Sequence, residues 1–152
     1  MALARGVLQA QMSEPQGAVT ETAYGFEVES SLPPQQAEEL VRRLLKEEGF
    51  GVLTEIDVRA TLKHTLGVDF RPYRILGACN PKLAHRALEA EPGIGLMLPC
   101  NVVVEESGPA TTLIRFMDPE AVLGIVSKPE LTAVAADARE RLLRVAAGIN
   151  DT

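Results

Sequence analysis

The sequence predicts an α/β (α+β) domain of two layers, a mixed sheet of about five strands with helices mainly on one face. Three observations favour this fold class. Segments in which polar and apolar residues alternate repeatedly give way to segments of helical periodicity. Proline and glycine stand at the boundaries between them. The composition, 46% hydrophobic and 24% charged over 152 residues, is that of one globular domain.

A strand and a helix begin the domain. Residues 23–29 alternate as a half-buried strand does. Pro33 and Pro34 stand where the first turn of a helix tolerates proline, and Gly49 ends that helix as a left-handed cap. The apolar face of the strand consists of Tyr24, Phe26 and Val28. The buried stripe of the helix consists of Ala37, Leu40, Val41, Leu44 and Leu45.

The middle of the chain continues this alternation. A second strand is expected over 51–57, a short helix over 58–66 and a third strand over 72–79. Asn80 then supplies a helix N-cap and Pro81 the first helical residue. The sequence therefore places a strand-to-helix junction directly after Cys79.

The last third carries the most apolar segment, 94–104, which predicts a central strand broken at Pro99, because proline cannot donate to a sheet. Residues 111–117 return as its hairpin partner, and 129–148 form the last helix. If the connection from 72–79 to 94–104 is a right-handed crossover, those two strands run parallel. The buried stripe of the last helix consists of Leu131, Val134, Ala138, Leu142, Val145 and Ile149.

Net charge and the composition of individual segments limit the domain organisation, partners and compartment that we expect. Residues 1–22 lack sustained periodicity, apart from a short helix that 2–11 would allow, so we expect an N-terminal arm followed by a single domain over 23–150. With 21 acidic and 15 basic residues, a formal charge of −6, nucleic acid is not an expected partner. No apolar stretch is long enough to span a membrane and no signal peptide is visible, so we expect a cytoplasmic protein. The two cysteines are then expected to be thiols.

The apolar strand at 94–104 also bears on assembly. It carries more Val and Leu than a sheet face open to water would hold. A homodimer that stacks sheets or exchanges edge contacts would cover that face, and we therefore expect a second copy as a partner.

Three strings, GFGVLTEIDVRATLKHTLGVDF, YRILGACNPKLAHRALEAEP and GLMLPCNVVV, resemble an uncharacterised bacterial and archaeal family. It is the domain-of-unknown-function family numbered three hundred and two, and the resemblance covers about 24–148. It implies a two-layer α/β fold, often a homodimer, and no established activity. The residues that match the family motifs are Glu55, Asp57, Cys79, Asn80, Pro81, Pro99, Cys100 and Asn101.

Two Cys-Asn dipeptides are the first candidate site. Cys79-Asn80 lies at a strand-to-helix junction and Cys100-Asn101 follows the strand break. The helix beginning at Pro81 would offer backbone N–H groups to an anion and would lower the pKa of Cys79. The alternative is that both cysteines are small core residues and that Asn80 is only a cap.

Two carboxylates are the second candidate. Glu55 and Asp57 share one strand face, where they could act as an acid/base pair, hold a hard cation, or simply pair with Arg59, Arg71 or Arg74. The spacing of the two histidines, His64 and His85, from the cysteines lacks the paired motif of a zinc site. We therefore predict no metal and no cofactor.

Three hypotheses of function arise from these residues. The first is a small anionic or polar ligand bound near the Cys-Asn motifs by a cytoplasmic homodimer. The second is a thiol-dependent enzyme or redox sensor that uses Cys79. The third is a structural or interaction module without catalysis. Ligand, reaction and substrate are not specified by the sequence.

Overall fold

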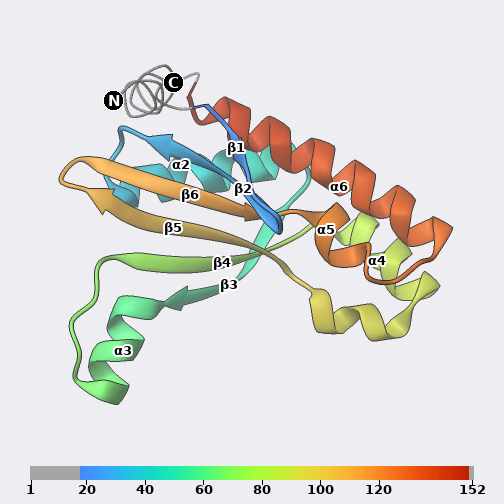
Figure 1. The fold of residues 1–152 in the computed structure, drawn as a ribbon, viewed down its shortest axis with the longest axis horizontal. Coiled ribbons are helices and arrows are strands. Elements are labelled where there is room, and N and C mark those ends of the chain that lie inside the picture. Colours follow the sequence, from blue (N-terminus) through green and yellow to red (C-terminus); the bar gives the residue numbers. More distant parts are fainter. Residues whose placement is uncertain (1–17, 151–152) are drawn as a thin grey trace, which may run out of the picture.

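The computed structural model describes residues 18–150, which form one antiparallel sheet with helices packed on one face (Figure 1). The strand order is β1-β2-β6-β5-β4-β3. The helix allowed by 2–11 lies outside the described residues, as does most of the predicted arm. The strands are β1 (Thr20–Glu21), β2 (Gly25–Ser30), β3 (Gly51–Asp57), β4 (Tyr73–Cys79), β5 (Cys100–Gly108) and β6 (Thr111–Met117).

Side-chain caps begin three of the helices, and of these caps Asn80 was predicted from the sequence. Asn80, Asp57 and Asp118 each accept a hydrogen bond from a backbone N–H in the first turn of the helix they cap. Gly49 follows the first of the helices with a φ of 85°, a conformation that glycine adopts without strain. The helices are α2 (Pro34–Glu47), α3 (Val58–Leu66), α4 (Pro81–Ala90), the 3₁₀ helix η1 (Pro92–Met97), α5 (Pro119–Leu123) and α6 (Pro129–Gly148).

The two-layer α/β architecture is confirmed, but the predicted mixed sheet is wrong. Every strand pair is antiparallel, and β1 adds a sixth strand to the five expected. The reason lies in the connection after Cys79. Ala78 pairs with Cys100, so the chain leaves β4 and enters β5 at the same end of the sheet. Figure 1 shows α4 and η1 gathered beyond that end, where they reverse the chain instead of crossing the sheet.

The expected strand over 94–104 is also wrong in its first half. Residues 92–97 form η1, and β5 begins only at Cys100, after a cis peptide bond between Leu98 and Pro99. Pro92 begins this helix, where the first turn tolerates proline, and Gly93 and Gly95 weaken the run as a strand. An apolar run of this length reads equally well as a buried strand, so periodicity alone could not separate the two.

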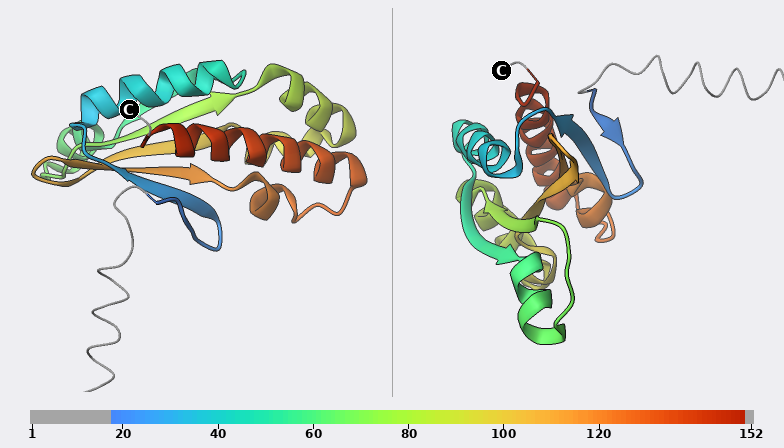
Figure 2. Two further views of the ribbon diagram at one scale, coloured as in Figure 1. Left: turned by 90° about the horizontal axis from the view of Figure 1, so that it is seen from above. Right: turned by 90° about the vertical axis from the view of Figure 1, so that its left-hand side faces the viewer.

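The core lies between the sheet and the pair α2 and α6, which Figure 2 shows on the same side of the strands. All six residues of the predicted stripe of α6 are buried. In β2, Phe26 and Val28 face this core as predicted, and the ring of Phe26 stacks on that of Phe116 with centroids 5.4 Å apart. Tyr24 does not share their burial: it precedes the strand and is 73% exposed.

Two parts of the molecule lie outside this core. The second face of the sheet is covered by no helix of residues 18–150, and α3 projects from the body and buries none of its residues (Figure 1).

Of the helices in the described residues, none is long and apolar enough to cross a membrane.

Candidate functional site

An apolar cavity of about 260 Å³ opens at the end of the sheet where β4 and β5 meet α4, α5 and α6. We call it the cysteine cavity, because Cys79 and Cys100 both line it. Its other lining residues are Phe50, Leu53, Thr54, Ala78, Asn80, Leu83, Ala84, Ala87, Leu98, Pro99, Pro119, Leu123, Val134 and Ala138.

The antiparallel register brings the two cysteines together. Cys100 lies opposite Ala78, the neighbour of Cys79, so the thiols come from adjacent strands at one sheet end. Cys100 is 8% exposed and Cys79 is half-buried, and both are free thiols. Gly77 makes room beside them, because a side chain there would collide with Thr54 and Pro99.

The electrostatics of both thiols oppose the predicted activation. Burial raises the pKa of Cys79 above its ordinary value. Burial, followed by repulsion from Cys79, raises the pKa of Cys100 to about 11. The expectation that the end of α4 lowers the pKa of Cys79 is therefore wrong, because loss of water around the half-buried thiol disfavours the thiolate. Both side chains are neutral thiols at pH 7.

Asn80 is a structural cap whose polar atoms are already engaged. Its Oδ1 accepts a hydrogen bond from the N–H of Leu83 at 3.3 Å, and its Nδ2 donates to the carbonyl of Glu48 at 3.4 Å. The N–H of Ala84 donates to the Asn80 carbonyl, and Pro81 has no N–H. The first turn of α4 therefore keeps few backbone donors for an anion.

Asn101 does not join the other residues of the two dipeptides. Cys100 faces the helices, so its neighbour in β5 points to the opposite face, where Asn101 is exposed and lies across from Gly77. The two Cys-Asn dipeptides, identical in sequence, thus put their asparagines on different sides of the sheet.

Glu55 and Asp57 belong to a third location, an ion-pair cluster between β3 and α2. Glu55 accepts hydrogen bonds from Arg42 at 2.6 Å and from Arg74 at 2.9 Å. Hydrogen bonding to Arg42 is the main cause that holds the pKa of Glu55 below its usual range. Asp57 caps α3 through the N–H of Ala60, at 2.9 Å. Of the arginines expected to pair with these carboxylates, Arg74 does pair with Glu55, whereas Arg71 pairs with Glu105. The pairing of Arg42 with Glu55 was not predicted.

The histidines take no part in the cysteine cavity. His85 lies on the exposed side of α4, 3.0 Å from Glu89, and His64 lies on the projecting α3. Among residues 18–150, His, Cys, Asp and Glu side chains nowhere gather in a group of three that could hold a metal ion.

Sequence reasoning missed the helical wall of the cavity. Leu83 and Ala87 of α4, Leu123 of α5, and Val134 and Ala138 of α6 line it, yet each falls on an ordinary buried stripe. A run of small residues on two facing helices is the one available signal. That signal marks close packing as readily as a cavity.

A two-layer α/β fold with an apolar cavity at one sheet end defines a class of small domain, and comparison with known proteins names the family. The family described as domain of unknown function DUF302 matches residues 26–149. The chain belongs to this family.

A solved structure supports the same assignment. The chain is similar to an uncharacterized conserved DUF302 protein from Bacillus stearothermophilus, with 34% identity and a TM-score of 0.74. The match covers 82% of this chain and 96% of that one. Among curated proteins, none matches significantly. Neither the family nor the solved structure has a described activity.

Proposed function

We propose that this protein binds a small apolar molecule in the cysteine cavity. The observation that carries the proposal is the lining, in which aliphatic side chains dominate and the few polar groups are engaged or weak. A concave site of about 260 Å³ with an almost wholly apolar lining is the kind of site in which proteins bind small apolar molecules. Each methylene group of a ligand that becomes buried in the cavity would contribute roughly 0.8 kcal/mol to the free energy of binding.

The lining also favours one chemical class over another. An anion bound near the Cys-Asn motifs would need donors, but Asn80 is occupied by Leu83 and Glu48. The thiols of Cys79 and Cys100 are weak hydrogen-bonding groups that behave as small apolar surfaces. We therefore propose an apolar ligand instead of the anionic or polar one that the sequence suggested. The raised pKa values likewise weigh against a thiol-dependent enzyme.

Substitutions that fill the cavity test this proposal. Ala138→Leu on α6 should abolish the binding of 1-octanol, measured by titration with 15N-labelled protein, and Ala84→Leu on α4 serves as a second filling variant. Ala133→Leu, on the exposed side of α6, is the matched control and should bind as the parent does. The proposal fails if no shift in the cavity resonances saturates with 1-octanol, or if both filling variants bind as the control does.

We also propose that two copies associate through the β3 edge. β3 is the last strand of the sheet, its backbone edge is unpaired on one side within residues 18–150, and Leu53 and Ile56 are 70% and 48% exposed. Exposed apolar edges of this kind pair with other strands. In sedimentation velocity, Ile56→Lys should shift dimer to monomer and Val68→Lys, on the loop after α3, should not. A monomeric parent protein, or a dimer insensitive to Ile56→Lys, would reject this interface.

The compartment is inferred from the same cysteines. We propose a cytoplasmic location, supported by two neighbouring cysteines that remain thiols although they lie on adjacent strands. Fractionation of the native host should recover the protein with both thiols open to alkylation after unfolding. Recovery from an oxidising compartment would contradict it.

A further inference from the structure

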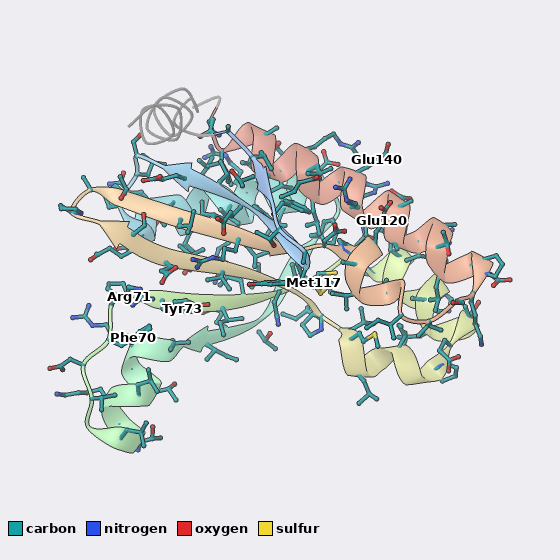
Figure 3. The ribbon with its side chains drawn as sticks, viewed as in Figure 1. Phe70, Arg71, Tyr73, Met117, Glu120 and Glu140 are labelled. Carbon is teal, nitrogen blue, oxygen red and sulfur yellow. The ribbon has the colours of Figure 1, made fainter. Side chains whose placement is uncertain are left out.

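The uncovered face of the sheet carries a groove of about 540 Å³ whose walls are charged and aromatic, unlike those of the cysteine cavity. It runs over β4, β5 and β6 toward the loop before β2. Figure 3 shows Phe70, Arg71 and Tyr73 close together at the start of β4, with Met117 toward the other end of β6. The groove and the cysteine cavity lie on different surfaces, so a ligand of the groove is independent of the proposed function.

A buried carboxylate organises this groove. The Glu105 side chain is only 6% exposed, although β5 presents it to the face without helices. Arg71 donates from Nε to Glu105 Oε2 at 2.5 Å, and Arg115 donates to the other carboxylate oxygen. Burial raises the pKa of Glu105, but the hydrogen bonds from Arg115 and Arg71 outweigh it, so the pKa lies below its ordinary value. The carboxylate is therefore charged at neutral pH and holds both arginines in place.

The two arginines keep donors that point away from Glu105. Arg71 uses Nε in its ion pair, and within residues 18–150 its Nη1 and Nη2 meet no acceptor. Its side chain is 52% exposed, and the guanidinium lies 4.4 Å from the centroid of the Phe70 ring. Arg115 is tied by Nε to Glu27 at 3.2 Å and by Nη1 to Glu105. Arg71 thus presents a fixed, half-exposed set of N–H groups.

Aromatic and polar surface lies beside these donors. Phe70 and Tyr73 meet edge to face with centroids 6.1 Å apart, and Tyr24, 73% exposed, lies at the far wall of the groove. Asn101 adds an exposed amide on the floor. Flat rings pack well on such aromatic surface, and guanidinium N–H groups match carboxylate and phosphate oxygens.

A gain in stability is a weak explanation for this arrangement. A buried ion pair is often no more stabilising than apolar residues of similar volume, because taking the charges out of water offsets their attraction. Holding Arg71 and Arg115 on one buried carboxylate does, however, fix their direction, as a binding site for an oxyanion needs. We propose that this groove binds a small organic anion, a flat ring that carries a carboxylate or phosphate group. The oxyanion pairs with Arg71 and the ring lies against Tyr73.

The test compares charged and neutral forms of one ring. The probes are naphthalene-2-carboxylate, 2-naphthyl phosphate and the neutral 2-naphthylmethanol, titrated against 15N-labelled protein. The two anions should shift amide resonances of β4, β5 and β6, and their affinities identify the preferred oxyanion. The alcohol should bind at least tenfold more weakly, since it lacks the charge-assisted hydrogen bonds.

Variants distinguish binding at this site from nonspecific binding. Arg71→Gln should weaken the anions about tenfold or more and leave the alcohol unchanged, while Arg71→Lys, which keeps the charge without the planar fork, should lie between. Arg59→Gln, on the projecting α3, is the matched control and should change neither. Equal binding of anion and alcohol, or anion binding indifferent to Arg71→Gln, overturns the proposal. A dimer that covers this face and excludes all three probes also overturns it.

Discussion

The two asparagines of the Cys-Asn dipeptides offer a sharp test, because one sequence context has two structural roles. Asn80→Ala removes the cap of α4 and the hydrogen bond to Glu48. Loss of an N-cap costs about 1 kcal/mol, and the second hydrogen bond, at 3.4 Å, adds little. We therefore expect Asn80→Ala to lower the free energy of unfolding by about 1–2 kcal/mol. Asn101→Ala, exposed on the other face, should stay within about 0.5 kcal/mol of the parent.

Urea unfolding followed by circular dichroism measures this difference, and the melting temperature of Asn80→Ala should fall by about 3–6 °C. Asn80→Asp refines the reasoning, since aspartate caps as well as asparagine but cannot donate to the Glu48 carbonyl. It should recover most of the lost stability. Equal losses for Asn80→Ala and Asn101→Ala would refute the assignment of Asn80 as a cap, and so would an Asn80→Asp variant as unstable as the alanine one.

Three further outcomes are expected from burial and charge. Burial raises the pKa of Cys100 to about 11, whereas a free thiol has a pKa of about 8.5. The folded state therefore loses stability as the pH rises from about 8.5 toward 11. Cys100→Ala should make the free energy of unfolding, measured by urea titration, depend less on pH across that range. At neutral pH, iodoacetamide should modify half-buried Cys79 before Cys100, and mass spectrometry showing the reverse order would contradict the burial described. Because the pKa of Glu105 is lowered, its stabilisation is present above about pH 4.3 and is lost as pH falls, so Glu105→Gln should show a shallower loss of stability in acid than the parent.

The helices of this fold could be predicted from the sequence because their signals are local. Asn80 followed by proline marks the start of α4, and the apolar stripe from Leu131 to Ile149 marks the buried side of α6. The direction of β5 could not be predicted, since it depends on whether the segment after α4 crosses the sheet or turns back. That choice is made by packing of η1 against α4 and α5, which no residue pattern encodes locally.

The candidate site was predicted in part for a related reason. Cys79 and Cys100 line one cavity, but the antiparallel pairing of β4 and β5 that brings them together was not predicted. Asn101, Glu55 and Asp57 lie elsewhere, because strand alternation turns Asn101 away from Cys100 and the edge position of β3 brings Glu55 to Arg42. Glu105 was not predicted as a buried residue, because a glutamate in an alternating strand predicts an exposed side chain. Its burial depends on ion pairs with Arg71 and Arg115, which lie 34 and 10 residues away in sequence.

The pairing of Ala78 with Cys100 makes β4 and β5 the two arms of one β-hairpin, and everything between them is an insertion in place of its turn. The two helices of this insertion, α4 and η1, lie at one side of the cysteine cavity, where α4 forms a wall, while the remaining walls belong to the scaffold. Doubling the length of a flexible loop costs only about 0.6 kcal/mol in closure entropy. A relative could therefore lengthen or exchange this insertion, and so reshape the cavity, without altering the register of any of the strands.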